Sequence, residues 1–249
     1  YLGYQVYSVP TGELLIGMDG KLNPKATLGY SDGTYYYIPD NWSDEIFENN
    51  VRQEYNLSVS GASDKMNYYM SAGYLDDQGI VPNSGFQRYS ARLKADYQVK
   101  PWLKLGANVS FTHYDSREQD TEGGTSNANI FYASNIMGAI YPMYIRDAQG
   151  NIMTDNRGFQ RYDYGKKGQD TNGSRNTIPN ANPLASYMLD KMKYSGDVVS
   201  GKWFADVDIW GGIKAKVNIG VDANNVRNTD MVNPFYGQYS ETTGVGGLI

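Results

Sequence analysis

Residues 89–111 read YSARLKADYQVKPWLKLGANVSF, and this stretch decides the fold. Apolar and polar side chains alternate along it on both sides of a short break at Pro101 and Trp102. Successive side chains of a β-strand point to opposite faces, so this alternation predicts two strands, each with one apolar and one polar face. The apolar positions are Tyr89, Ala91, Leu93, Ala95, Tyr97, Val99, Leu103, Leu105, Ala107, Val109 and Phe111.

The same alternation recurs along the chain and predicts about six strands between residues 54 and 223. Four of them fall within 54–114 and two within 193–223. The connections alternate in length: 61–65, 100–102 and 210–212 are short, whereas 76–85 and 115–182 are long. We therefore expect an all-β chain with its longest loop over residues 115–192.

The remaining segments are expected to be loops. Turn signals dominate residues 1–53, and residues 224–249 show no sustained alternation. Within the loop of residues 115–192, residues 127–140 have helical spacing and could be capped by Ser126 or Asn127. Asn182-Pro183 is typical of a helix start, and residues 146–152 are typical of a hairpin.

Composition excludes several function classes. The chain has 249 residues, a formal net charge of −5, one His and no Cys. The negative charge argues against a nucleic-acid partner, and the absence of Cys excludes disulfides and thiolate sites. One histidine, His113, leaves no multi-His metal site, and it has no evident partner in the sequence. The sequence contains no recognisable catalytic motif. We therefore expect that the protein binds neither a metal nor a cofactor and is not an enzyme.

Short turns at one end and long loops at the other describe a transmembrane β-barrel, with the apolar faces toward lipid and the polar faces toward a lumen. Trp102 and Trp210 fall at the short-turn end, and Tyr74 and Tyr89 near the long-loop end. These four positions are candidates for two aromatic girdles at the membrane boundaries. A soluble β-sandwich gives the same alternation and remains the alternative.

The charges on the polar faces are expected to line the lumen. Asp206 and Asp208 share one face of a strand, and Lys202, Lys214 and Lys216 lie on the matching faces of the same two strands. Paired carboxylates can also serve glycosidase chemistry, but neighbouring lysines favour the lumenal reading.

The loops hold the candidates for ligand contact. Aromatic rings stack on the apolar faces of sugars, and amide, carboxylate and guanidinium groups bond their hydroxyls. On residue chemistry alone, the candidates are Tyr36, Trp42, Arg161, Tyr162 and Tyr164.

Several ordered blocks resemble one family. They include Asn41-Trp42-Ser43-Asp44-Glu45-Ile46-Phe47, Tyr68-Tyr69-Met70-Ser71-Ala72-Gly73-Tyr74-Leu75 and Gly85-Phe86-Gln87-Arg88-Tyr89. The order of these blocks, followed by Trp102-Leu103-Lys104-Leu105-Gly106, resembles the SusC/RagA-type TonB-dependent outer-membrane transporters of the Bacteroidetes. The resemblance covers nearly the whole chain.

The resemblance implies a large 22-stranded barrel, plugged in its lumen, of which this chain would be an interior segment lacking the plug domain. It implies outer-membrane import of oligosaccharides, or of peptides. It also implies a SusD-like surface lipoprotein as partner, contact with outer-membrane lipid, and coupling to the TonB complex through an N-terminal region. A passive porin or barrel adhesin, and a soluble carbohydrate-binding β-sandwich, remain the alternatives.

Overall fold

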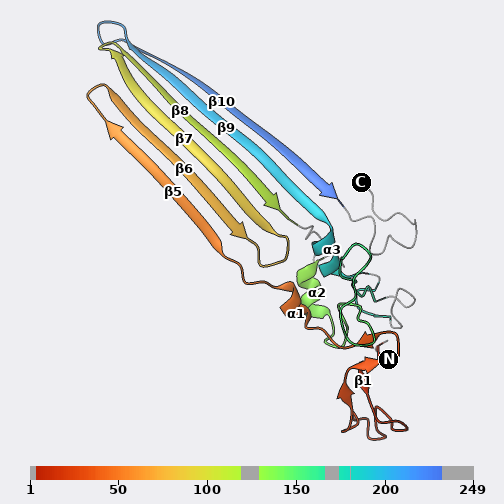
Figure 1. Cartoon of the computed structure of the whole chain (residues 1–249). Coiled ribbons are helices and arrows are strands. Elements are labelled where there is room, and N and C mark those ends of the chain that lie inside the picture. The colour runs from red at the N-terminus through yellow and green to blue at the C-terminus, as the bar shows by residue number, and fades with distance from the viewer. Residues whose placement is uncertain (1–3, 119–128, 166–173, 180, 232–249) are drawn as a thin grey trace. The chain divides into compact units, whose positions relative to one another are not determined.

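A computed structural model describes residues 4–118, 129–165, 174–179 and 181–231 of the chain (Figure 1). These residues divide into two compact units. The sheet unit spans Asn49–Glu118 and Met192–Asp230. The loop unit gathers the described parts of Tyr1–Glu48 and Gln119–Lys191, with Met231 at its edge.

The sheet unit is one antiparallel sheet of six strands, in the spatial order β10-β9-β8-β7-β6-β5 (Figure 1). Each strand lies beside its neighbour in the sequence. The strands are β5 (Arg52–Ala62), β6 (Met66–Gln78), β7 (Gly85–Lys100), β8 (Leu103–Arg117), β9 (Lys191–Asp208) and β10 (Lys214–Met231).

Short hairpins and longer connections alternate in this sheet. Residues 63–65, 101–102 and 209–213 join pairs of strands at one end. At the other end, residues 79–84 join β6 to β7, and residues 118–190 join β8 to β9. The alternation of connection length is therefore confirmed.

The strands run further than the sequence pattern indicated. β6 ends at Gln78, inside the connection expected from residue 76, and β9 begins at Lys191 rather than near 193. β10 continues to Met231, although we expected a loop from residue 224. These additional strand residues lie where apolar and polar side chains no longer alternate. They were not predicted because backbone hydrogen bonding between strands continues beyond the apolar region.

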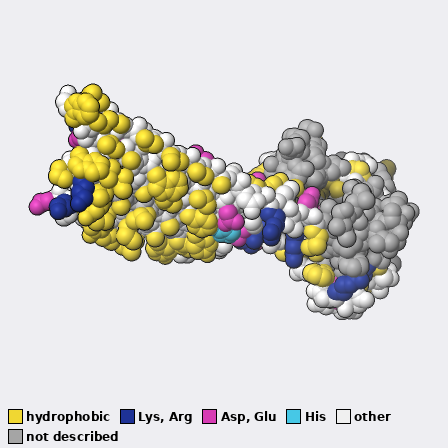
Figure 2. Space-filling model, turned by 90° about the horizontal axis from the view of Figure 1, so that it is seen from above, with side chains coloured by type: hydrophobic (Ala, Val, Ile, Leu, Met, Phe, Trp, Pro, Cys, Tyr) yellow, Lys and Arg dark blue, Asp and Glu magenta, His cyan; other side chains and the backbone are white. Residues whose placement is uncertain are grey.

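The apolar face of the sheet is not covered by other described residues. Figure 2 shows hydrophobic side chains gathered over this face. Leu57, Leu93, Val217 and Ile219 are each between 47% and 70% exposed. The described residues hold no second sheet packed on this one, so the β-sandwich alternative does not match the observed architecture.

The loop unit contains short elements. Its strands are β1 (Tyr7–Ser8), β2 (Thr27–Leu28), β3 (Tyr30–Ser31) and β4 (Tyr36–Tyr37), which pair as β1-β2 and β3-β4. Its helices are α1 (Trp42–Ile46), α2 (Ile130–Ile136) and α3 (Pro183–Leu189). The expected hairpin at 146–152 is present, with a bridge between Arg146 and Ile152.

Asparagine side chains begin all three helices. The predicted cap at Asn182 is confirmed, because its side chain accepts a hydrogen bond from the backbone N–H of Ala185. The prediction for the second helix was wrong in detail, because Asn129 caps α2 through Tyr132, and Ser126 and Asn127 lie outside the described residues.

The loop unit has the apolar core that the sheet unit lacks. Ile46 of α1, Ile130 and Ala133 of α2, and Met143 are fully buried, and Leu184 of α3 is 3% exposed. The helices therefore pack their apolar sides together, as the spacing in α2 predicted. Among the described residues, no helix has the length and apolar character needed to span a membrane.

Candidate functional site

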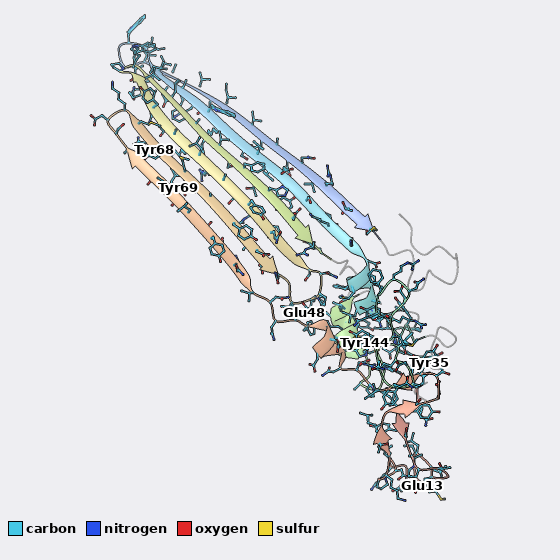
Figure 3. The ribbon with its side chains drawn as sticks, viewed as in Figure 1. Glu13, Tyr35, Glu48, Tyr68, Tyr69 and Tyr144 are labelled. Carbon is cyan, nitrogen blue, oxygen red and sulfur yellow. The ribbon has the colours of Figure 1, made fainter. Side chains whose placement is uncertain are left out.

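The strand register places the apolar side chains of the sheet in continuous rows. From β5 to β9, one row of successive cross-strand neighbours consists of Val59, Met70, Leu93, Val109 and Gly201. In the next row Leu57, Ala72, Ala91, Phe111 and Val199 follow the same order. Neighbouring residues such as Tyr68 and Tyr69 of β6, labelled in Figure 3, belong to opposite faces.

A row of rings ends the apolar face at its long-loop end. Tyr55 stacks on Tyr74 with centroids 6.4 Å apart, Tyr74 lies 5.0 Å from Tyr89, and Tyr89 lies 6.4 Å from the His113 ring. The structure thus brings the girdle candidates Tyr74 and Tyr89 together. It adds Tyr55 and His113, which the sequence analysis missed.

The same face becomes polar directly beyond this row. Gln87 donates to Asp76 at 3.3 Å, and Ser195 donates to Asp115 at 2.5 Å. Lys193 lies 3.1 Å from Asp115. Figure 2 shows the hydrophobic surface giving way to charged side chains and the histidine. The ring row therefore marks a sharp boundary between apolar and polar surface.

His113 has a partner that the sequence did not reveal. Its Nδ1 lies 2.7 Å from Asp197 Oδ1, across the β8-β9 pairing, and its Nε2 lies 4.0 Å from Asp115 Oδ2. No partner was evident in the sequence, because residues 84 apart become neighbours only through strand pairing.

The height of the apolar face fits a membrane. The row of His113 and the row of Leu103 and Val207 bound it on β8 and β9. Ten residue steps from Leu103 to His113 cover roughly 33 Å along a strand. A strand tilt of about 40–45° reduces this to roughly 25 Å, the height of the lipid-facing band of outer-membrane barrels.

The other two girdle candidates lie at the short-turn end. Trp102 sits in the β7-β8 turn and Trp210 in the β9-β10 turn, and they are 52% and 77% exposed. Two exposed indoles at one end of an apolar band match a position in a membrane interface. Their place in a girdle stays a prediction.

The opposite face of the sheet is polar and carries ordered ion pairs. Lys214 lies 3.0 Å from Asp208, and Lys216 lies 3.3 Å from Asp206. Lys104 lies 3.8 Å from Asp96 on the neighbouring strands. The pairing of Asp206 and Asp208 with lysines supports a charged wall rather than a catalytic pair.

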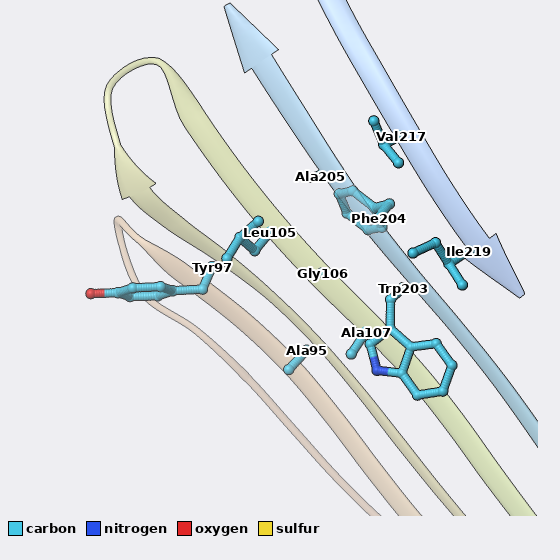
Figure 4. A pocket seen from close by; sticks show the side chains of 10 residues that line it. All are labelled: Ala95, Tyr97, Leu105, Gly106, Ala107, Trp203, Phe204, Ala205, Val217 and Ile219. Carbon is cyan, nitrogen blue, oxygen red and sulfur yellow. The ribbon is translucent and has the colours of Figure 1, made fainter.

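Small side chains leave a shallow groove on the apolar face (Figure 4). Ala95, Ala107 and Ala205 form its floor, and the larger rings of Tyr97 and Trp203 flank it. Its volume is about 440 Å³. The described residues that line this groove present almost only apolar surface, so it has the character of surface that contacts lipid chains.

The loop unit contains a more polar cleft of about 480 Å³. It is lined by Pro39, Asp40, Asn41, Trp42, Ser43, Ser134, Met137 and Ala139. Hydroxyl and amide groups therefore lie near Trp42 in this cleft, and they can form hydrogen bonds with the hydroxyls or backbone of a ligand.

A two-pronged ion pair fixes one wall of this cleft. Arg146 donates to both carboxylate oxygens of Asp40, at 2.6 and 3.0 Å, and Asp40 also accepts from the backbone N–H of Met143 at 2.6 Å. Tyr144 donates to Glu45 at 2.9 Å. Segments about 100 residues apart are thus held together around α1.

The five ligand-contact candidates fall into different environments. Trp42 and Tyr162 are 3% and 5% exposed. Trp42 donates to the carbonyl of Tyr141 at 3.0 Å, and Tyr162 packs on Tyr144 with centroids 5.4 Å apart. Tyr36, Arg161 and Tyr164 are half-buried. Only Trp42 lines the cleft, and ligand contact by any of the five stays a prediction.

A buried polar network supports the ring of Trp42. The Arg175 guanidinium lies 5.5 Å from that ring and 3.6 Å from Asp163. Asp163 also accepts from the Tyr4 hydroxyl at 2.8 Å. Asn182 donates to the carbonyls of Met143 and Asp163 at 3.0 Å each. Apart from the helix-start pattern at Asn182, no local sequence pattern predicted this network.

Burial shifts the ionisation of these groups. Desolvation, together with the hydrogen bond to Glu45, holds the pKa of Tyr144 well above its usual value. Burial raises the pKa of Asp163, although the Arg175 charge and the Tyr4 hydroxyl oppose the shift. Burial also lowers the pKa of Arg175. Because every shift opposes the charged form, the network serves packing more readily than proton transfer.

Comparison with known proteins gives consistent matches. TonB-dependent receptor P3 of Formosa agariphila is 24% identical over 214 residues, which cover 83% of this chain and 18% of that protein. TonB-dependent receptor SusC of Bacteroides thetaiotaomicron is 33% identical over 88 residues, 35% of this chain and 9% of that protein. No family model matches.

Solved structures agree on the fold. The RagAB peptide importer in its open-open state aligns with a TM-score of 0.59 and 23% identity, over 82% of this chain and 21% of that chain. Over most of its length, the chain is similar to a segment of a SusC/RagA-type TonB-dependent receptor. Its six-stranded sheet matches a segment of the receptor barrel. The chain spans 9% to 18% of the length of the curated receptors.

Proposed function

We propose that this SusC/RagA-type segment forms part of the wall and extracellular loops of an outer-membrane importer. The whole receptor would take up oligosaccharides or peptides together with a SusD-like lipoprotein, driven by the TonB complex. The matched proteins are named as receptors and transporters. The short turns would face the periplasm and the loop unit would face outside.

One observation carries the proposal: a single antiparallel sheet presents an uncovered apolar face about as tall as a lipid-facing band, with a charged face behind it. The apolar face would contact outer-membrane lipid, and the charged face would line the lumen. The tyrosine-histidine row and the two turn tryptophans would mark the membrane boundaries.

The loop-unit cleft is the proposed place of ligand contact on this segment. Asn41, Ser43 and Ser134 supply hydrogen-bonding groups beside Trp42, and the Asp40–Arg146 pair holds one wall of the cleft. Tyr36, Arg161 and Tyr164 are half-buried and are secondary candidates.

The test is uptake by the native host. We expect cells lacking the receptor gene to lose uptake of one class of oligosaccharide or peptide, and cells lacking TonB function to lose it equally. Continued uptake without TonB would indicate a passive porin. Unchanged uptake of every oligomer without the receptor would indicate an adhesin and would overturn the importer proposal.

A further inference from the structure

Most cations on the polar face of the sheet have a carboxylate close by. Arg52 and Arg88 lie 3.2 and 3.5 Å from Glu54. Lys104, Lys214 and Lys216 pair with Asp96, Asp208 and Asp206 at 3.0–3.8 Å. The pairs therefore occupy the two ends of this face, near the long connections and near the short turns.

The cations in the middle of the face lack such a partner. Arg92 of β7 donates to the Asn108 amide oxygen at 3.0 Å, and no carboxylate of the described residues lies within 4 Å of Arg92, Lys94 or Lys202. Two acidic groups lie nearby on this face. Asp96 is two residues from Lys94 on β7 and pairs with Lys104, and Asp222 of β10 accepts from Ser200 at 2.5 Å. The centre of the wall thus has more cations than carboxylates, and neither nearby carboxylate lies within 4 Å of the three cations.

Register places these three cations close together. Lys94 lies opposite Asn108, which lies opposite Lys202, so the two lysines are two strand spacings, or roughly 10 Å, apart. Arg92 is two residues from Lys94 on the same face. Arg92, Asn108, Ser110, Ser200, Lys202 and Asp222 line a concavity of about 320 Å³. Like charges at this spacing repel one another, most of all where water is displaced.

We propose that Arg92, Lys94 and Lys202 form a seat for carboxylate side chains of an acidic protein segment of the same receptor that occupies the barrel lumen. The inference rests on the proposed function, because it needs this face to line a lumen. Outer-membrane transporters with 22 strands have a plugged lumen.

Charge complementarity selects this occupant. Cations covered by protein remain stable only when carboxylates pair with them. At both ends of the face, carboxylates of the sheet itself pair with the cations. At the centre, the carboxylates must come from outside the sheet. Small side chains at Ser58, Ser71, Ser110 and Ser200 lie in the Arg92 row, so the seat is open to a packed segment. A solute present only in transit would leave the three charges uncompensated for most of the time.

The test is zero-length carbodiimide cross-linking of the full receptor extracted in detergent, followed by peptide mass spectrometry. Carbodiimide joins a lysine amine to a carboxylate only at contact distance. We expect Lys94 or Lys202 to be linked to an Asp or Glu elsewhere in the receptor, outside this sheet. The link between Lys216 and Asp206 within the wall is the positive control.

Two results would overturn the seat. One is that Lys216 cross-links to Asp206 while Lys94 and Lys202 form no link and are fully acetylated by an amine reagent. The other is that Lys94 and Lys202 link only to the lipoprotein or to a bound solute. Uptake measured on the same cells tests the importer separately, so an intact importer without the link rejects only the seat.

A variant pair adds a functional readout. Combining Arg92→Gln, Lys94→Gln and Lys202→Gln removes the charge, and we expect several-fold greater entry of a large antibiotic because the lumenal segment is held less firmly. Combining Arg92→Lys, Lys94→Arg and Lys202→Arg keeps the charge and should restore wild-type resistance. Equal resistance in all three strains, at equal receptor abundance, would contradict the proposal.

Discussion

Asp40 and Arg146 form a two-pronged ion pair across 106 residues of sequence, with N–O distances of 2.6 and 3.0 Å. Their side chains are only 8% and 12% exposed. The pair joins the segment before α1 to the strand-like segment after Tyr144, and it fixes one wall of the proposed ligand cleft.

We expect Asp40→Asn to destabilise the loop unit by about 3–5 kcal/mol, because it leaves the Arg146 charge buried without its partner. Limited proteolysis at increasing urea concentration, followed by mass mapping of the first cleavage sites, measures this change. Lys25→Gln is the control, because it breaks the exposed pair with Glu13 and should change stability far less. Equal effects of the two changes would contradict a structural role for the buried pair.

Asn182 allows a matched comparison of two helix caps. Asn182 begins α3 and also donates to two buried carbonyls, whereas Asn129 only begins α2. We expect Asn182→Ala to cost about 2–4 kcal/mol and Asn129→Ala about 1 kcal/mol, measured by the same proteolysis titration. Similar costs would show that the carbonyl contacts of Asn182 add nothing.

The raised pKa of Tyr144 leads us to expect that the loop unit loses stability at high pH. Burial and the Glu45 hydrogen bond raise its pKa in the folded protein above the unfolded value of about 10. Its contribution is therefore fully present below about pH 10 and is lost as the pH rises from there toward the folded pKa. Tyr162 and Tyr164 are shifted in the same direction.

The measurement is the urea midpoint of loop-unit proteolysis between pH 8 and pH 11. We expect wild type to lose stability above about pH 10. Tyr144→Phe should be less stable at pH 8, because it loses the hydrogen bond to Glu45, but its stability should fall less steeply above pH 10. Parallel pH profiles for the two proteins would show that Tyr144 does not contribute to the loss.

We expect an added charge to destabilise the protein far more on the apolar face of the sheet than on the polar face. Val109→Arg places a cation on the apolar face and should cost about 2–4 kcal/mol if Val109 lies near the membrane midplane. Thr112→Arg, on the polar face of the same strand, should cost much less. Equilibrium unfolding in lipid vesicles measures both, and a larger cost for Thr112→Arg would reverse the assignment of faces.

The sequence was sufficient to predict the six strands of the sheet, but not where several of them begin and end. Alternation in residues 89–111 predicted β7 and β8 because one face of each is uniformly apolar. β9 begins two residues earlier than predicted, and its first part shows no clean alternation because Met192, Tyr194 and Val198 put apolar groups on the polar face. The last residues of β10 were missed because they lie where neither face is apolar.

Long-range side-chain partners were out of reach for a related reason. Pairs such as His113 with Asp197, and Asp163 with Arg175, depend on strand pairing or loop packing that no local pattern encodes. Residue chemistry selected Trp42 and Tyr162 as ligand contacts, and the fold buries most of both rings. Exposure is set by packing across the loop unit, which composition does not reveal.

The central claim is that one face of this sheet meets lipid and the other meets a lumen. This chain has no cysteine. Once any cysteine elsewhere in the receptor is replaced, spin labels can be attached one at a time to single cysteines at positions 105–112 of the receptor in vesicles. We predict a period of two, with labels at odd positions accessible to oxygen dissolved in lipid and labels at even positions shielded from it. Labels at the odd positions that are inaccessible to both oxygen and water-soluble nickel would place this face in a protein core and contradict the account.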